Sequence, residues 1–91
     1  MRKTMRLTER EEQVLRLIPE GADGTTTARE LASLVYEDAF EEYDRPEVAI
    51  GDVVRRLVKK GETSPNGLHG FRIHRTRRAG RNPIEIWKRR I

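Results

Sequence analysis

The sequence predicts a small α+β domain made of three helices followed by an antiparallel β-hairpin. Two observations predict this fold class. Apolar residues recur every three or four positions as far as residue 58, and every second position after residue 70. Clusters rich in Gly, Pro, Asn and Asp separate these segments and are typical of turns. With 91 residues, the chain is expected to form one domain that spans residues 1–91.

The first helix is expected to begin after Thr8 and to stop at Pro19. Thr8 and Glu11 have the spacing of a capping box, in which each side chain bonds a backbone N–H group near the other residue. The apolar stripe of this helix is Leu7, Val14, Leu15, Leu17 and Ile18. Residues 20–24 then read as a turn.

The second helix is expected to begin after Thr27, where Glu30 completes another Thr-x-x-Glu pattern. Thr25 and Thr26 favour β-structure and predict a very short strand just before it. The residues that share the apolar face of this helix are Ala28, Leu31, Ala32 and Val35.

The end of the second helix is open. Tyr36, Phe40 and Tyr43 continue a helical spacing through an acidic segment, so one alternative extends the helix to about Tyr43, and the other inserts an extra turn. These three aromatic residues are expected to pack in the core. The alternative is a surface for self-association or for a protein partner.

The third helix is expected to begin near Pro46, since proline suits the first turn of a helix. Gly61 is expected as the residue just after its end, with Lys59 and Lys60 near the carbonyl terminus. Its buried face is Ile50, Val53, Val54, Leu57 and Val58. Gly51 lies inside this helix, where glycine is unfavourable. Either another group approaches the helix closely at this position, or the glycine is a neutral feature of the surface.

The hairpin is expected to pair strands at about 71–77 and 84–90. Phe71 and Ile73 alternate with polar residues in the first strand, and Ile84 and Ile86 alternate in the second. Residues 79–83 form the connecting turn. Trp87 is out of phase with Ile86, and periodicity does not decide whether it covers the first helix or lies at an interface.

Positive charge is concentrated at the carboxyl end of the chain. Residues 62–91 carry a net charge of +6, whereas the whole chain carries +4. The basic residues of this segment are Arg72, Arg75, Arg77, Arg78, Arg81, Lys88, Arg89 and Arg90. A basic hairpin behind a helical unit favours binding to the phosphates of a nucleic acid. The alternative is a solvated surface whose charges discourage edge-to-edge pairing.

Three segments together resemble the winged helix-turn-helix DNA-binding superfamily. Thr27-Ala-Arg-Glu-Leu-Ala is similar to the opening of the first helix of the motif, Val53-Val-Arg-Arg-Leu-Val-Lys-Lys-Gly61 to the end of a recognition helix, and Gly70-Phe-Arg-Ile73 to the first strand of the wing. The resemblance covers roughly residues 7–90. Residues 36–45 depart from the family, whose helices are joined by a turn of about three or four residues.

The resemblance implies binding to double-stranded DNA, with the third helix in the major groove and the basic wing on the backbone or the minor groove. The expected contacts are Thr27, Arg29, Arg45, Arg55, Arg56, Lys59, Arg75, Arg77, Arg78 and Arg81. The expected role is transcriptional regulation, either as a monomer or as a homodimer that reads two half-sites. The alternatives are a protein-interaction module, a replication or packaging factor of a phage or mobile element, and a binder of structured RNA.

Catalysis and cofactor binding are not expected. His69 and His74 are the only histidines, and no carboxylates beside them match metal-ligand spacing. The chain has no cysteine, no glycine-rich phosphate loop and no nucleophile motif. No apolar run approaches the roughly 18 residues of a membrane span, so we expect a cytoplasmic protein without membrane contact.

Overall fold

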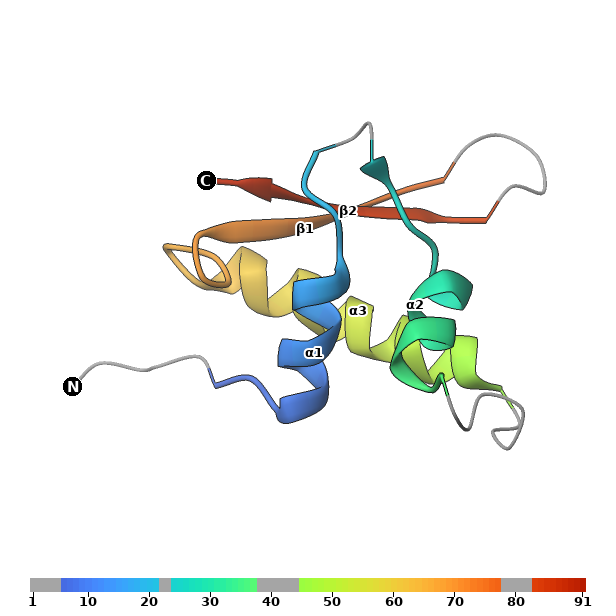
Figure 1. Cartoon of the computed structure of the whole chain (residues 1–91). Coiled ribbons are helices and arrows are strands. Elements are labelled where there is room, and N and C mark those ends of the chain that lie inside the picture. Colours follow the sequence, from blue (N-terminus) through green and yellow to red (C-terminus); the bar gives the residue numbers. More distant parts are fainter. Residues whose placement is uncertain (1–5, 22–23, 38–44, 78–82) are drawn as a thin grey trace.

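The computed structural model describes residues 6–21, 24–37, 45–77 and 83–91. The elements, in chain order, are α1 (Glu9–Leu17), α2 (Ala28–Val35), α3 (Pro46–Thr63), β1 (Phe71–Thr76) and β2 (Glu85–Arg90). The hairpin lies across one side of the three helices (Figure 1). The prediction of an α+β fold with three helices and an antiparallel hairpin is therefore confirmed.

Helix α1 begins as the sequence predicts. The Thr8 hydroxyl accepts the Glu11 backbone N–H at 3.1 Å, and the Glu11 carboxylate accepts the Thr8 backbone N–H at 2.9 Å. Both halves of the capping box are thus formed, and they satisfy two N–H groups that a helix end leaves free. The helix ends at Leu17, two residues before Pro19.

Helix α2 begins after Thr27, as the sequence predicts, but one capping bond and the carboxyl end differ from the prediction. The Thr27 hydroxyl accepts the Glu30 N–H at 3.2 Å, but the Glu30 carboxylate accepts the Thr26 hydroxyl at 3.0 Å, so the second half of the predicted capping box is wrong. The helix ends at Val35 with Tyr36 as its C-cap, so the alternative of a helix reaching Tyr43 is also wrong. Phe40 and Tyr43 lie outside the described residues.

Helix α3 starts with Pro46 in its first turn, as predicted, but it continues past Gly61 to Thr63. The prediction that Gly61 follows the helix is therefore wrong. Gly61 is buried, and the Thr63 hydroxyl satisfies carbonyl groups of the last turn by donating to Lys59 O at 3.1 Å or Lys60 O at 3.3 Å. A side-chain cap thus replaces the glycine termination that the local sequence suggests.

The two strands of the hairpin pair from Phe71 opposite Arg90 to Thr76 opposite Glu85. Each strand is one residue shorter than predicted. Strand β2 is also bonded on its other edge, where Thr26 and Ile86 exchange two backbone hydrogen bonds of 2.8 and 2.6 Å. The prediction of a very short β-segment before α2 is therefore confirmed as a single bridge at Thr26.

The core lies between the helices and the inner face of the hairpin. Its buried apolar residues are Val14, Leu15, Ile18, Leu31, Ala32, Ile50, Val53, Val54, Leu57, Leu68, Ile73 and Ile86. Because Ile73 and Ile86 bring one residue from each strand into this cluster, the inner face of the hairpin is held against the helices. Strand β2 begins on the α2 side of the molecule and ends on the opposite side (Figure 1).

Candidate nucleic-acid interface

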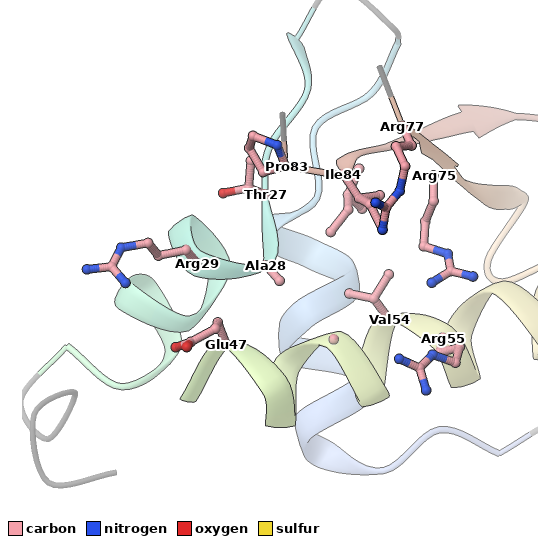
Figure 2. Close-up of a pocket in the computed structure, with 12 residues that line it drawn as sticks. Thr27, Ala28, Arg29, Glu47, Val54, Arg55, Arg75, Arg77, Pro83 and Ile84 are labelled. Carbon is pink, nitrogen blue, oxygen red and sulfur yellow. The ribbon is translucent and has the colours of Figure 1, made fainter. Parts of the chain in front are cut away.

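A groove lies between the amino end of α2, the amino-terminal half of α3 and the loop end of the hairpin (Figure 2). We call it the basic groove. Its volume is about 430 Å³, within the roughly 300–1,000 Å³ that is usual for ligand sites. Its polar lining consists of Thr27, Arg29, Glu47, Arg55, Arg75 and Arg77. These three segments are far apart in the sequence, and folding brings them together.

Helix α3 supplies the lower wall of the groove through a stripe of residues four positions apart. Glu47, Gly51 and Arg55 follow this spacing and therefore lie on one side of the helix. Val54 is next to them and is almost fully buried in the core. The packing of Val54 fixes the rotation of α3, so that this stripe faces the hairpin.

The end of β1 supplies the upper wall. Side chains of a strand alternate between its two faces, so Arg75 and Arg77 lie on the same face as the buried Ile73. Arg75 is also paired in register with the buried Ile86. The two arginines therefore project from the inner face of the hairpin beyond the edge of the core, and both point into the space above α3 (Figure 2).

The amino end of α2 supplies the third wall. Thr27 caps this helix, and Arg29 lies in its first turn. The amino end of a helix carries a partial positive charge and favours an anion nearby. The helix terminus therefore has the same electrostatic preference as the arginines of the other two walls.

The charge of the basic groove is predominantly positive, since four arginines and one glutamate line it. Arg55 lies 3.4 Å from Asp52, but both side chains are more than half exposed, and such pairs contribute about 0–1 kcal/mol. Within the described ranges, Arg75 and Arg77 have no hydrogen-bond or ion-pair partner. Their guanidinium groups are available for a phosphate, which arginine binds with two parallel hydrogen bonds.

The floor of the groove is apolar, a feature that the sequence does not predict. It is formed by Ala28, Val54, Pro83, Ile84 and Ile86. Nothing in the sequence distinguishes these residues from ordinary core positions. Only Gly51, an unfavourable residue inside a helix, gave a hint that this part of α3 is unusual.

Arg56 lies on a different flank of α3 from Arg55, because successive helical residues are about 100° apart. Its Nε atom is 3.3 Å from the carboxylate of Glu11 on α1, and the Nζ atom of Lys60 is 2.7 Å from the same carboxylate. Glu11 is almost completely buried. Arg56 does not line the basic groove, and we leave it out of the interface proposed below.

The pKa of the Glu11 carboxyl lies below its ordinary value. Burial alone would raise this pKa, but hydrogen bonds from Lys60 and Thr8, the charge of Lys60 and a hydrogen bond from Arg56 outweigh burial. The charged Glu11 carboxylate therefore joins α1 to α3 through its hydrogen bonds with Lys60 and Arg56. The sequence predicts the capping role of Glu11 but not its partners on α3.

The other residues expected to contact DNA are not brought into the groove. Arg45 is the exposed N-cap residue of α3 and makes no side-chain capping bond, and Lys59 is exposed on the same helix. Arg78 and Arg81 lie outside the described residues. Thr27, Arg29, Arg55, Arg75 and Arg77 are the expected contacts that line the groove.

Lys88 and Arg90, near the end of β2, contact other parts of the protein and do not line the groove. Lys88 donates to the backbone carbonyl of Leu15 at 3.0 Å, and Arg90 lies 3.3 Å from the carboxylate of Glu20. Burial lowers the pKa of Lys88, although the charge of Glu20 acts in the opposite direction. These two residues attach β2 to the end of α1 and the segment that follows it.

Two aromatic residues whose roles the sequence left open have intramolecular partners. Trp87 stacks on His74 with ring centroids 4.5 Å apart, on the face of the hairpin opposite Ile86. Tyr36 packs against the core, and the guanidinium carbon of Arg10 lies 4.8 Å from the centre of its ring. The expected core role of Tyr36 is therefore confirmed.

Metal-ligand clusters and membrane-spanning helices are both absent from the part of the chain that the structure describes. No group of three His, Cys, Asp or Glu side chains there has a geometry suited to a metal ion. None of the described helices combines the length and the apolar character needed to cross a membrane. Comparison of the chain with protein-family models, curated proteins and solved structures found no significant match.

Proposed function

We propose that this chain is a winged helix-turn-helix domain that binds double-stranded DNA through the basic groove and acts as a transcriptional regulator. One observation carries the proposal: five of the residues expected to contact DNA, from three separate elements, line a single concave surface. They are Thr27, Arg29, Arg55, Arg75 and Arg77. The order of α1, a bridged residue, α2, α3 and a hairpin supports the winged-helix assignment.

In the proposed complex, Arg55 reaches the major groove from α3, and Arg75 and Arg77 contact phosphates from the hairpin. Arginine recognises the O6 and N7 atoms of guanine with two hydrogen bonds, so Arg55 is the candidate for reading sequence. The hairpin arginines supply affinity without sequence preference. Each phosphate that they neutralise adds roughly −0.9 to the slope of log affinity against log salt concentration.

The test is a fluorescence-anisotropy titration of a labelled DNA duplex at several salt concentrations. The double variant Arg75→Glu/Arg77→Glu is expected to lose affinity for all sequences and to show a salt slope shallower by about 1–2. The matched control is Arg16→Glu/Arg89→Glu, which makes the same change in net charge at two exposed positions outside the groove.

Two outcomes would reject the proposal. Equal losses for the groove variant and the control variant would mean that overall charge, not the groove, governs binding. A wild-type protein without salt-dependent affinity for duplex DNA would favour the protein-interaction module instead. The same titration with duplex RNA tests the RNA alternative, and sedimentation with and without DNA tests the predicted homodimer.

A further inference from the structure

Gly51 lies in the second turn of α3, inside a regular helix. Glycine is the least favourable helix residue after proline, because it loses the most backbone freedom on folding. A glycine at this position therefore calls for a structural reason. Two reasons are common: another part of the protein leaves no room for a side chain, or a ligand needs the space.

The described part of the protein leaves ample room at Gly51. A Cβ atom built there would have no described atom outside its own helix backbone within 4 Å. The other glycine of the same helix differs, because a Cβ at Gly61 would lie 3.8 Å from the backbone of Arg72 and 3.8 Å from the side chain of Leu68. These distances at Gly61 are ordinary van der Waals contacts, so Gly61 has packed neighbours, whereas Gly51 has none among the residues that the structure describes.

The missing side chain creates a notch in the lower wall of the basic groove. Glu47 and Arg55 lie one turn before and one turn after Gly51 on the same side of α3, and Arg75 and Arg77 project from the opposite wall (Figure 2). The notch is therefore bordered by guanidinium groups on two sides. Its floor is formed by apolar side chains such as Val54 and Ile84.

A charged rim over an apolar floor matches the chemistry of a sugar–phosphate strand. Phosphate oxygens accept hydrogen bonds from guanidinium groups, and the carbon atoms of the sugars contact apolar side chains. A base edge, in contrast, is read by polar side chains that protrude from a helix. At Gly51 the helix offers only its backbone.

We propose that the sugar–phosphate backbone of one DNA strand passes between α3 and the hairpin at Gly51, where the absence of a side chain leaves room for it. This inference rests on the proposed function and specifies how the groove is occupied. Arg55 extends past the strand on the helix side toward the base edges, and Arg75 and Arg77 contact its phosphates from the hairpin side. The strand then separates the base contacts of α3 from the phosphate contacts of the hairpin.

The test is Gly51→Leu, which fills the notch with a residue that favours helix. The expected result is at least a tenfold loss of affinity for duplex DNA in the anisotropy titration, with no fall in melting temperature. Ala49→Leu is the matched control, because it adds the same side chain to an exposed position of α3 outside the groove. Its affinity is expected to stay within twofold of the wild type.

Gly51→Ala provides a second variant that adds only one methyl group and retains the fold if leucine does not. It is expected to raise the melting temperature, because alanine favours helix more than glycine does. It is also expected to weaken binding by about two- to fivefold, because the methyl group occupies part of the notch. Wild-type affinity for DNA in a folded Gly51→Leu protein would overturn the inference about Gly51. If Gly51→Leu does not fold, wild-type affinity in Gly51→Ala would overturn it. In either case, loss of binding in Arg75→Glu/Arg77→Glu would leave the proposed function standing. Failure of the wild-type protein to bind duplex DNA would instead overturn the proposed function.

Discussion

Glu11 offers the sharpest prediction about stability. Its carboxylate is 1% exposed and accepts hydrogen bonds from the backbone N–H of Thr8 at 2.9 Å, from Lys60 at 2.7 Å and from Arg56 at 3.3 Å. The first bond caps α1, and the other two join α1 to α3. Replacing Glu11 by alanine removes all three interactions at once.

The expected magnitude follows from the exposure of the partners. Loss of one partner from a buried ion pair costs about 3–5 kcal/mol when the remaining charge stays buried. Here the side chains of Lys60 and Arg56 are 26% and 56% exposed, so water replaces part of the lost interaction. We therefore expect Glu11→Ala to lower the free energy of unfolding by about 2–3 kcal/mol, or the melting temperature by roughly 8–24 °C for a domain of this size.

The contribution of Glu11 also depends on pH. Because its pKa is lower in the folded protein than its ordinary value of 4.5, the folded state favours the charged form. The resulting stabilisation is fully present above the unfolded pKa and is lost as the pH falls through the lower folded pKa. Glu11→Gln removes this titration, so its stability should depend less on pH in the acid range.

The assay is thermal unfolding followed by circular dichroism at pH 7 and across the acid range. Glu9→Gln is the control, because it makes the same change at an exposed position of the same helical turn. The reasoning would be refuted if Glu11→Gln and Glu9→Gln had the same melting temperature at pH 7. Parallel pH profiles for wild type and Glu11→Gln would refute the explanation of the pKa.

Two further pairs of substitutions test the structure. Arg55→Ala should weaken DNA binding and relax its sequence preference, with little change in stability. Arg56→Ala should lower the melting temperature by several degrees and leave DNA affinity within about twofold of the wild type. The opposite pattern in titrations and melting curves would reverse the roles assigned to these two arginines. Gly67→Ala should cost about 2–3 kcal/mol, because the residue has a φ of +65° and a Cβ would collide with the carbonyl oxygen of Phe71. Gly70→Ala, with a φ of +86° in open space, should cost only about 1 kcal/mol. Equal costs in urea unfolding would contradict the geometry of this turn.

The features that the sequence predicted well depend on local interactions. Thr8 and Glu11 bond to each other's backbone across three residues, and the sequence pattern contains all that this requires. The alternation of Phe71 and Ile73 likewise indicates the strand and its buried face. Such signals survive folding because their partners are adjacent in the chain.

The features that the sequence did not predict depend on distant partners. Gly61 resembles a helix-ending glycine, yet α3 continues past it to Thr63, and Gly61 is buried beside Leu68 and Arg72. Arg56 looked like a DNA contact, because a helical pattern shows which face is apolar but not which exposed flank another helix covers. Its partner, Glu11, is 45 residues away in the sequence.

The basic groove was predicted in part. Charge indicated Arg75 and Arg77, and the family resemblance implied Arg29 and Arg55 and suggested that helix and hairpin lie together. The apolar floor was not predicted, because residues such as Ile84 have the same appearance in a core and in a binding site. Its recognition required the relative positions of α2, α3 and the hairpin.

The central claim is that α3, the amino end of α2 and the hairpin present one surface to DNA. The most direct measurement is a two-dimensional ¹H–¹⁵N NMR titration of the wild-type protein with a DNA duplex. We predict that the largest shift changes fall on backbone amides lining the basic groove, including those of Arg29, Gly51, Arg55 and Arg77. Changes confined to α1 and the outer face of the hairpin, or no changes at all, would contradict the account.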